Sequence, residues 1–540
     1  MKPLSKTVTN SRTNQLKKLY SDSLDFYGRK QYALAKKNLI RFTDVYPENT
    51  HALTLLGSIA TQQELYDEAS AYFAKVVLID STQPAHFHNL GHSLQQLKKL
   101  EEALVCYDQA LALDPSFLNS LSNKASIYLK QYKLNEALNC YSKVIELDQT
   151  RLDDFVNYAM VLLELNMAEE ALEVCDISEK LGAEKRNVYL NKGFFLGRLR
   201  RDQEAEISYL KCLEIAPEES RARWNLSHLY LRNGLYRKGW PLYESRWENK
   251  QTEMQRKSLL QPLWLGVESL AGKSIYLHHE QGLGDTIQFC RYAKNLEVLG
   301  AKVILDVQPP LLKLLAGLDG VHALVSSGDI IPAFDYHCPL MSLPLALGIN
   351  EDNFATPIPY IKAPEHKVNE WRTKVRNNSR LKVGLVWSGG DHSEHLSQRA
   401  INKRRNLDIE YFNIFKGLEI DFYSLQKGDP AESEFKDRQN NHLDELNIIN
   451  YADELKDFTD TAGLINHLDL VISVDTSTAH LAGAMGKPVW LLNRFDSCWR
   501  WGVEGDTTHW YSQMRIFRQP KPYDWDSVLS KIHDNLKALR

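Results

Sequence analysis

Residues 84–117 read PAHFHNLGHSLQQLKKLEEALVCYDQALALDPSF, and this stretch decides the fold of the first half of the 540-residue chain. It places two small residues, Gly91 and Ala103, twelve positions apart. Steps of 34 residues find a small residue at both positions in seven successive units, without an insertion or a deletion. The first positions are Ser23, Gly57, Gly91, Ala125, Ala159, Gly193 and Ser227, and the second are Ala35, Ala69, Ala103, Ala137, Ala171, Ala205 and Gly239. Small residues are needed where two helices cross closely, because larger side chains would push their axes apart.

The 34-residue pattern resembles the tetratricopeptide repeat, a helix–turn–helix unit. Proline stands near the end of several units, at Pro47, Pro115 and Pro217. The resemblance implies an α-solenoid with a long concave face, built from stacked helix pairs. We expect seven repeats over residues 16–245, with fourteen helices in antiparallel pairs.

Asparagine occupies the sixth position in five consecutive repeats. These residues are Asn89, Asn123, Asn157, Asn191 and Asn225, whereas the first two repeats have Ser21 and Leu55 there. An amide side chain offers both a donor and an acceptor, so the ladder can bind the backbone of an extended peptide regardless of its sequence. The alternative is that asparagine at this position only supports helix packing. The sequence favours the first interpretation, a groove for an acceptor protein.

The repeat period ends near Lys250, and residues 246–270 are interpreted as a connector. Beyond it, apolar runs alternate with helical stretches, a pattern typical of parallel α/β sheets. The expected strands are 274–279, 302–307, 321–325, 335–340, 382–387, 421–425, 470–474 and 488–492, with one helix over 285–299. We expect two Rossmann-like domains, 271–365 and 380–540, with a ligand between them at the carboxyl ends of the strands.

Two loops are candidates for chemistry. The first expected strand leads into Gln281-Gly282-Leu283-Gly284-Asp285, in which the glycines allow close approach to a ligand and Asp285 opens a helix. The alternative role for Asp285 is helix capping. The strand at 470–474 leads into Asp475-Thr476-Ser477-Thr478-Ala479-His480. A helix start with free N–H groups, three hydroxyls and an imidazole favours binding of a diphosphate. The alternatives are that the hydroxyls of Thr476–Thr478 cap the helix and that His480 is a buried imidazole with its own hydrogen-bond partners.

Together these motifs resemble the heptosyltransferase-like glycosyltransferases of family 9, which have the GT-B fold. The resemblance covers roughly residues 270–520 and includes Tyr423–Gly428 and Trp499-Arg500-Trp501. The layout is similar to that of repeat-fused flagellin glycosyltransferases and of protein O-GlcNAc transferase. The resemblance implies that Asp285 is the general base. It also implies a set of donor-binding residues: Gly282, Gly284, Arg404, Arg405, Lys427, Asp475, Thr476, Ser477, Thr478 and His480.

The implied reaction is inverting transfer of a sugar from a nucleotide sugar to a protein held by the repeats, with flagellin as one candidate acceptor. Neither a metal nor a cofactor is expected, and the Asp524-x-Asp526 motif is interpreted as a cap of the last helix. Two alternatives stay open: a repeat scaffold with an inactive transferase domain, and heptosyl transfer to a glycolipid.

Composition limits the remaining classes of function. The net charge is −4, with 43% hydrophobic and 25% charged residues, which fits a folded protein and argues against nucleic-acid binding. Seven cysteines without a C-x-x-C pair indicate reduced thiols. With no run of about 18 apolar residues and no secretory signal, a cytoplasmic location without a membrane span is expected, and a homo-oligomer is left open.

Overall fold

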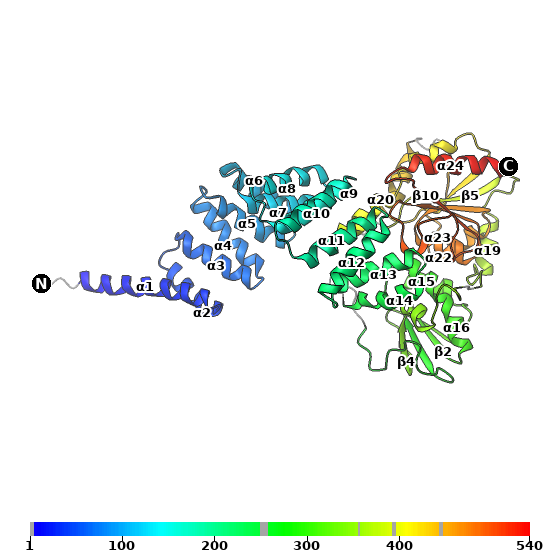
Figure 1. Cartoon of the computed structure of the whole chain (residues 1–540), viewed down its shortest axis with the longest axis horizontal. Coiled ribbons are helices and arrows are strands. Elements are labelled where there is room, and N and C mark those ends of the chain that lie inside the picture. Colours follow the sequence, from blue (N-terminus) through cyan, green and yellow to red (C-terminus); the bar gives the residue numbers. More distant parts are fainter. Residues whose placement is uncertain (1–4, 249–256, 355–356, 391–395, 442–445, 540) are drawn as a thin grey trace. The chain divides into compact units, whose positions relative to one another are not determined.

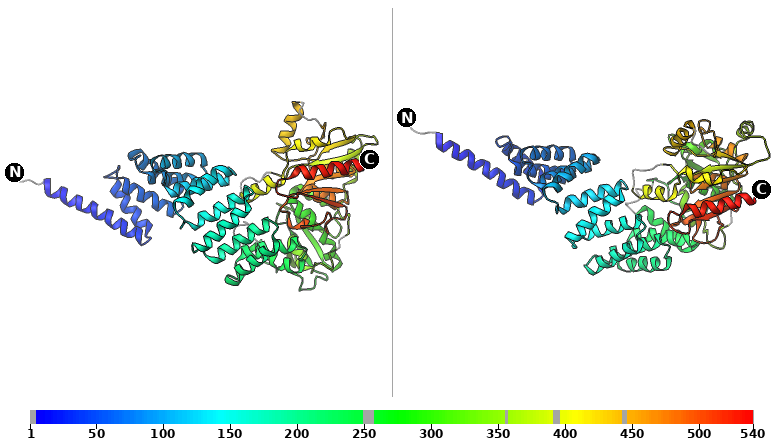
Figure 2. Two further views of the ribbon diagram at one scale, coloured as in Figure 1. Left: turned by 45° about the horizontal axis from the view of Figure 1, so that its top comes forward. Right: turned by 90° about the horizontal axis from the view of Figure 1, so that it is seen from above.

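The computed structural model describes residues 5–248, 257–354, 357–390, 396–441 and 446–539. It divides into two compact units, Met1–Ala183 and Glu184–Arg540, and each unit is described by itself. Figure 1 shows the chain with its elements labelled, and Figure 2 shows the same ribbons from two further directions.

The first unit consists of ten helices in five antiparallel pairs. They are α1 (Ser5–Gly28), α2 (Tyr32–Thr43), α3 (Thr50–Gln62), α4 (Tyr66–Ile79), α5 (Pro84–Gln96), α6 (Leu100–Leu113), α7 (Leu118–Lys130), α8 (Leu134–Leu147), α9 (Leu152–Glu164) and α10 (Ala168–Lys180). The second unit opens with two more pairs, α11 (Lys185–Arg198) with α12 (Asp202–Ile215) and α13 (Ser220–Arg232) with α14 (Tyr236–Tyr243). The predicted fourteen helices of the solenoid are therefore confirmed.

The turn between the two helices of each repeat has one residue in the left-handed region. These residues are Lys30, Glu64, Lys98, Tyr132, Asn166, Arg200 and Gly234, with φ between 59° and 73°. They recur every 34 residues, so the turn keeps one backbone shape along the array. A left-handed residue reverses the chain in a short turn, which is how each unit folds back on itself.

The small residues of the repeats lie where helices cross, as predicted. A Cβ on Gly91 would lie 2.8 Å from the ring of Tyr107, on the partner helix of the same repeat. The same close approach occurs at two further pairs, Gly57 with Phe73 and Gly193 with Tyr209. At such distances a methyl group would have to displace the aromatic ring, so the fully buried rings dictate the small residues.

After the 3-10 helix η1 (Glu244–Trp247), the second unit continues with a four-stranded parallel sheet in the order β3-β2-β1-β4. Its strands are β1 (Ser274–His278), β2 (Lys302–Val307), β3 (Ala323–Ser326) and β4 (Tyr336–Pro339). Its helices are α15 (Leu283–Phe289), α16 (Ala293–Val298), α17 (Leu312–Leu315) and α18 (Leu343–Ala346).

A second parallel sheet has six strands in the order β10-β9-β8-β5-β6-β7. Its strands are β5 (Leu381–Val386), β6 (Ile420–Ser424), β7 (Ile449–Asn450), β8 (Leu470–Val474), β9 (Val489–Asn493) and β10 (Met514–Arg518). Its helices are α19 (Glu365–Arg372), α20 (Leu396–Arg405), α21 (Ala431–Asn440), α22 (Phe458–Asn466), α23 (Ser477–Ala484) and α24 (Trp525–Ala538). Helix α24, red in Figure 1, packs beside β10.

The predicted fold class, a solenoid followed by two parallel α/β domains, is confirmed. All eight predicted strands are present, with ends shifted by at most two residues. Two strands, β7 and β10, were not predicted, because β7 is only two residues long and β10 alternates with charged residues. The predicted single helix over 285–299 is wrong: α15 ends at Phe289, and a 3-10 turn over Cys290–Tyr292 separates it from α16.

Within the second unit, the end of the repeat array packs directly on the α/β part. The rings of Trp240 and Tyr243 contact Trp499 edge-on, at centroid distances of 5.5 and 6.0 Å. The Tyr236 ring stacks on Phe354 at 4.5 Å. These buried aromatic rings join the last repeat and both sheets in one hydrophobic core. Among the helices that the structure describes, none has the length and apolar character needed to cross a membrane.

Candidate functional site

The two loops singled out from the sequence meet in the structure. The β1 loop leads into α15, the β8 loop leads into α23, and these two helices pack against each other. A Cβ on Gly284 would lie 2.9 Å from Cδ2 of His480 and 3.4 Å from Cα of Ser477. Only glycine fits this approach without displacing the imidazole, so Gly284 allows the two helix starts to come together.

Asp285 lies in the first turn of α15, and both of its carboxylate oxygens have partners. Oδ2 accepts a hydrogen bond from the N–H of Gly282 at 2.9 Å, while Oδ1 forms an ion pair with Arg500. The first contact is the capping role, in which Gly282 precedes the helix and Asp285 stabilises its start. The second contact joins the start of α15 to the segment after β9. Asp285 therefore caps its helix and also pairs with Arg500 from a distant part of the chain.

Arg500 has no assigned role in the sequence analysis, although it stands in the Trp499-Arg500-Trp501 motif. Its Nε donates to Oε1 of Gln288 at 2.7 Å, and its guanidinium lies 4.2 Å from the ring centroid of Trp499. Burial opposes the charge of Arg500, but Asp285 together with Cys498 and Tyr243 raises the pKa of the guanidinium above its usual value. A fixed cation therefore stands at the meeting point of the two helix starts. An arginine between two tryptophans was the sequence signal for it.

His480 is buried in the first turns of α23, 4% exposed. Nδ1 lies 2.8 Å from the hydroxyl of Tyr511, Nε2 lies 4.0 Å from Oδ1 of Asp475, and the ring packs on Trp501. Burial lowers the pKa of the imidazole to about 3, although Asp475 opposes this shift. The ring is therefore neutral at pH 7 and acts as a hydrogen-bonding group instead of a cation.

The start of α23 leaves backbone donors for a ligand. Thr476 is the N-cap residue, but its side chain makes no capping hydrogen bond; its Oγ1 lies 3.0 Å from Oγ of Ser473 instead. Ser477 and Thr478 are the next two residues, half-buried at the helix start. Positively polarised N–H groups at such a helix start favour an anion.

The two arginines of α20 have different surroundings. Arg405 contacts the loop after β8, since its Nη1 donates to the backbone oxygen of Asp475 at 3.1 Å, and its Nη2 donates to Oδ1 of Asn402 at 2.7 Å. A Cβ on Gly389 would collide with this guanidinium. Burial lowers the pKa of Arg405 from its usual value. A guanidinium bound to neutral oxygens keeps its charge available for a phosphate.

The other two predicted basic residues lie in other contacts. Arg404 forms an ion pair with buried Asp496 at 3.0 Å, which also pairs with Arg198 of α11 at 3.1 Å. Lys427, after β6, donates to the backbone oxygen of Ala452 at 2.8 Å and to Glu432 at 3.2 Å. At its start α24 is capped by Asp524, which accepts from the N–H of Ser527, so the capping interpretation of the D-x-D motif is confirmed.

Two buried donors near Arg500 and His480 lack partners among the described residues. They are Nε2 of Gln288 and Nε1 of Trp501, whose residues are 0% and 1% exposed. Gln288 binds Arg500, and Trp501 packs on His480. Buried polar groups are normally hydrogen-bonded, so these two donors are exceptions beside the arginine and the histidine.

Asparagines of the predicted groove contact buried tyrosines of the preceding repeat. Nδ2 of Asn123 donates to the hydroxyl of Tyr107 at 3.2 Å, and Asn225 hydrogen-bonds Tyr209. Both tyrosines lie sixteen residues before their asparagine. An amide group has two N–H groups and one oxygen, so one bond to a tyrosine does not exhaust it. Packing and peptide binding are therefore compatible at these positions.

The chain matches four family models over five spans. Residues 23–84, 85–117, 118–151 and 187–219 match tetratricopeptide repeats. Residues 416–494 match Glycosyltransferase family 9 (heptosyltransferase), a span that includes Asp475 and His480. The chain therefore carries tetratricopeptide repeats, which are protein-interaction modules, and a family 9 glycosyltransferase domain.

Among characterised proteins, the chain is 24% identical over 322 residues to Protein FlbA of Caulobacter vibrioides. The match covers 55% of this chain and 52% of FlbA, so the chain spans about half the length of this curated relative. Among solved structures, a tetratricopeptide repeat protein from Parabacteroides merdae is 15% identical, with a TM-score of 0.39 over 44% of this chain and 96% of that one. Pseudomonas aeruginosa pilF is 18% identical, with a TM-score of 0.34 over 39% and 96%.

Proposed function

We propose that this chain, which joins tetratricopeptide repeats to a family 9 glycosyltransferase domain, transfers a sugar from a nucleotide sugar to a hydroxyl of a protein bound by its repeats. The observation that carries the proposal is the contact of Gly284 with His480 and Ser477. This contact brings the only proposed base, Asp285, next to the helix start proposed to hold the diphosphate of the donor.

The proposed reaction is a single inverting displacement without a metal. Asp285 takes the proton of the acceptor hydroxyl while its oxygen bonds to the anomeric carbon, and the bond from that carbon to the diphosphate oxygen breaks. General-base catalysis of this kind contributes about 10²–10⁴-fold. Oδ1 of Asp285 is held by Arg500, which fixes the direction of the carboxylate while its remaining lone pairs receive the proton.

Negative charge then grows on the leaving diphosphate. The groups proposed to stabilise it are the N–H groups at the start of α23, the hydroxyls of Thr476–Thr478, and the guanidinium of Arg405. His480 contributes a hydrogen bond as a neutral imidazole. Preorganised donors of this kind supply a large electrostatic part of enzymatic rate enhancement.

The acceptor is proposed to be a protein because the transferase domain is continuous with a repeat array. Repeat solenoids present extended concave surfaces for binding, and the asparagine ladder offers backbone-directed hydrogen bonds along one. Flagellin is the candidate that the similarity of layout to repeat-fused flagellin glycosyltransferases favours.

The test is intact-mass spectrometry of candidate acceptors, flagellin first, incubated with the purified full chain and a panel of ADP-, UDP-, GDP- and CMP-linked sugars. The expected result is a mass increase of one sugar residue with the wild type and none with Asp285→Asn, while the variant still binds the donor. Failure of every donor to bind in calorimetry would contradict the proposed function.

A further inference from the structure

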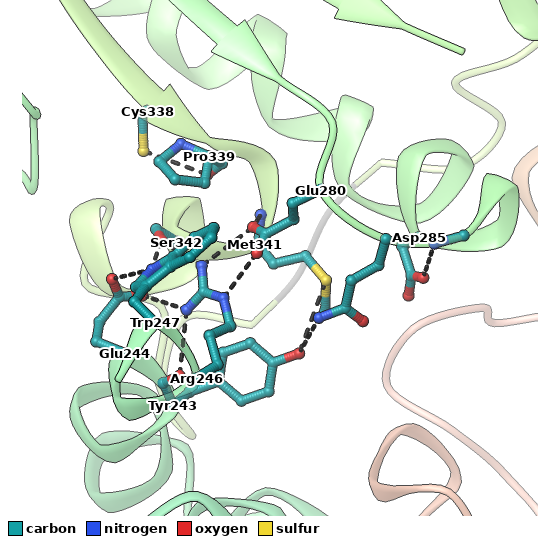
Figure 3. Close-up of polar contacts among 12 residues, drawn as sticks. Tyr243, Glu244, Arg246, Trp247, Glu280, Asp285, Cys338, Pro339, Met341 and Ser342 are labelled. Carbon is teal, nitrogen blue, oxygen red and sulfur yellow. Dashed lines mark hydrogen bonds and ion pairs between the residues drawn. The ribbon is translucent and has the colours of Figure 1, made fainter. Parts of the chain in front are cut away.

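Arg246, in the short helix that follows the last repeat, is completely buried and uses all five of its N–H groups. Nε and Nη2 donate to the two carboxylate oxygens of Glu280 at 2.7 and 3.0 Å. Nη2 also donates to Ser342 Oγ at 2.7 Å, and Nη1 donates to Glu244 at 2.7 Å and to the backbone oxygen of Tyr243 at 3.2 Å. Figure 3 shows the guanidinium at the centre of this network, which includes a bidentate pair with Glu280.

Glu280 is the other half of the pair, and its side chain is 4% exposed. Besides the two bonds from Arg246, its Oε1 accepts the backbone N–H of Met341 at 3.0 Å. Burial raises the pKa of Glu280, and Arg246 opposes this shift. With three donors around it and almost no exposure, Glu280 does not touch a substrate, so it is not itself the base.

The position of Glu280 in the chain gives the pair its significance. It is the fifth residue before Asp285 and stands just after β1, in the loop that leads into α15, as Figure 3 shows. The next residue, Gln281, donates from Nε2 to the hydroxyl of Tyr243 at 3.1 Å and accepts at its backbone oxygen from Gln308 at 2.9 Å. The start of the loop is thus held by the end of the repeat array, and its other end by Arg500.

We propose that Arg246 and Glu280 are a positioning pair through which the end of the repeat array fixes the loop that presents Asp285. The inference rests on the proposed function, because it assigns Asp285 the role of base. It adds that the segment after the last repeat, through Arg246, is needed to position the base, so that the α/β part is not a self-sufficient transferase.

The test compares Arg246→Met, Arg246→Lys, Glu280→Gln and the double variant Arg246→Met/Glu280→Gln in the full chain. Arg232→Met is the matched control, because Arg232 forms a similar, largely buried ion pair with Asp202 between the last two repeats, and its guanidinium donates to Asp202 and to the backbone oxygen of Gly197 instead of to the segment 280–285. The measurements are kcat, the donor Kd by calorimetry, and hydrogen exchange of the amides of residues 281–286.

We expect Arg246→Met to lower kcat about 10²-fold, the scale of a misplacement near 1 Å, with an unchanged donor Kd. Exchange of the loop amides should be faster than in Arg232→Met. Arg246→Lys should fall between the wild type and Arg246→Met, since an ammonium cannot bridge both oxygens of Glu280. The double variant should have the same kcat as Arg246→Met, because both substitutions remove the same interaction, the ion pair between Arg246 and Glu280.

Wild-type kcat and unchanged loop exchange in Arg246→Met, or an equal loss in Arg232→Met, would overturn the inference. If Arg246→Met does not fold, Arg246→Lys carries the same comparison. An inactive wild type with faster loop exchange only in the Arg246 variants would instead count against the proposed function and leave the positioning role standing.

Discussion

Replacing Gly284 by alanine tests the contact between the two helix starts. The added methyl would lie 2.9 Å from His480 Cδ2, whereas carbon atoms pack best at about 3.5–4.0 Å. The imidazole is buried and bound to Tyr511, so it has little freedom to retreat. The two helix starts must then separate by roughly 0.6–1 Å, which costs about 1–3 kcal/mol of stability.

The same displacement moves Asp285 away from α23, the helix proposed to hold the donor diphosphate. A shift of this size lowers the transfer rate about 10²-fold. The assay measures the transfer rate, the donor Kd and the free energy of unfolding of Gly284→Ala. The matched control is Gly317→Ala, because a Cβ on Gly317 meets no atom within 4 Å. A Gly284→Ala enzyme with the transfer rate of the control would refute the idea that the two loops act together.

The remaining predictions concern donor, acceptor and pH. His480→Ala should weaken donor binding in calorimetry by roughly ten- to a hundred-fold, the worth of one hydrogen bond to a charged group. If the variant binds every donor tested as tightly as the wild type does, His480 is not part of the donor site. Replacing Asn123, Asn157 and Asn191 together by alanine should weaken acceptor capture about a hundred-fold in pull-downs while donor binding survives; normal capture would make the ladder a packing feature. Burial lowers the pKa of His480 to about 3 and of His228 to about 4, so the unfolded chain binds more protons than the native one below pH 6.5. The contribution of these two histidines to the free energy of unfolding should therefore be fully present above pH 6.5 and fall by about 2 kcal/mol per histidine at pH 5. An equal melting temperature at pH 7 and pH 5 would contradict these pKa shifts.

The sequence by itself determined the repeat array and the positions of most strands along the chain. The glycines Gly57, Gly91 and Gly193 are local requirements, because each meets an aromatic ring of its own repeat only sixteen residues later. Buried parallel strands such as β8 are continuous apolar runs, so they too are visible in a single sequence. Both signals come from short-range periodicity, which one chain is enough to reveal.

Only the tertiary structure decided which distant residues meet. Arg500 contacts Asp285, and Arg246 contacts Glu280, across 215 and 34 residues of chain. Arg404 and Arg405 are adjacent in sequence, yet one pairs with Asp496 and the other with the loop of Asp475. The physical reason is that a charged side chain acquires its role from the partner that burial forces on it, and no local pattern encodes that partner.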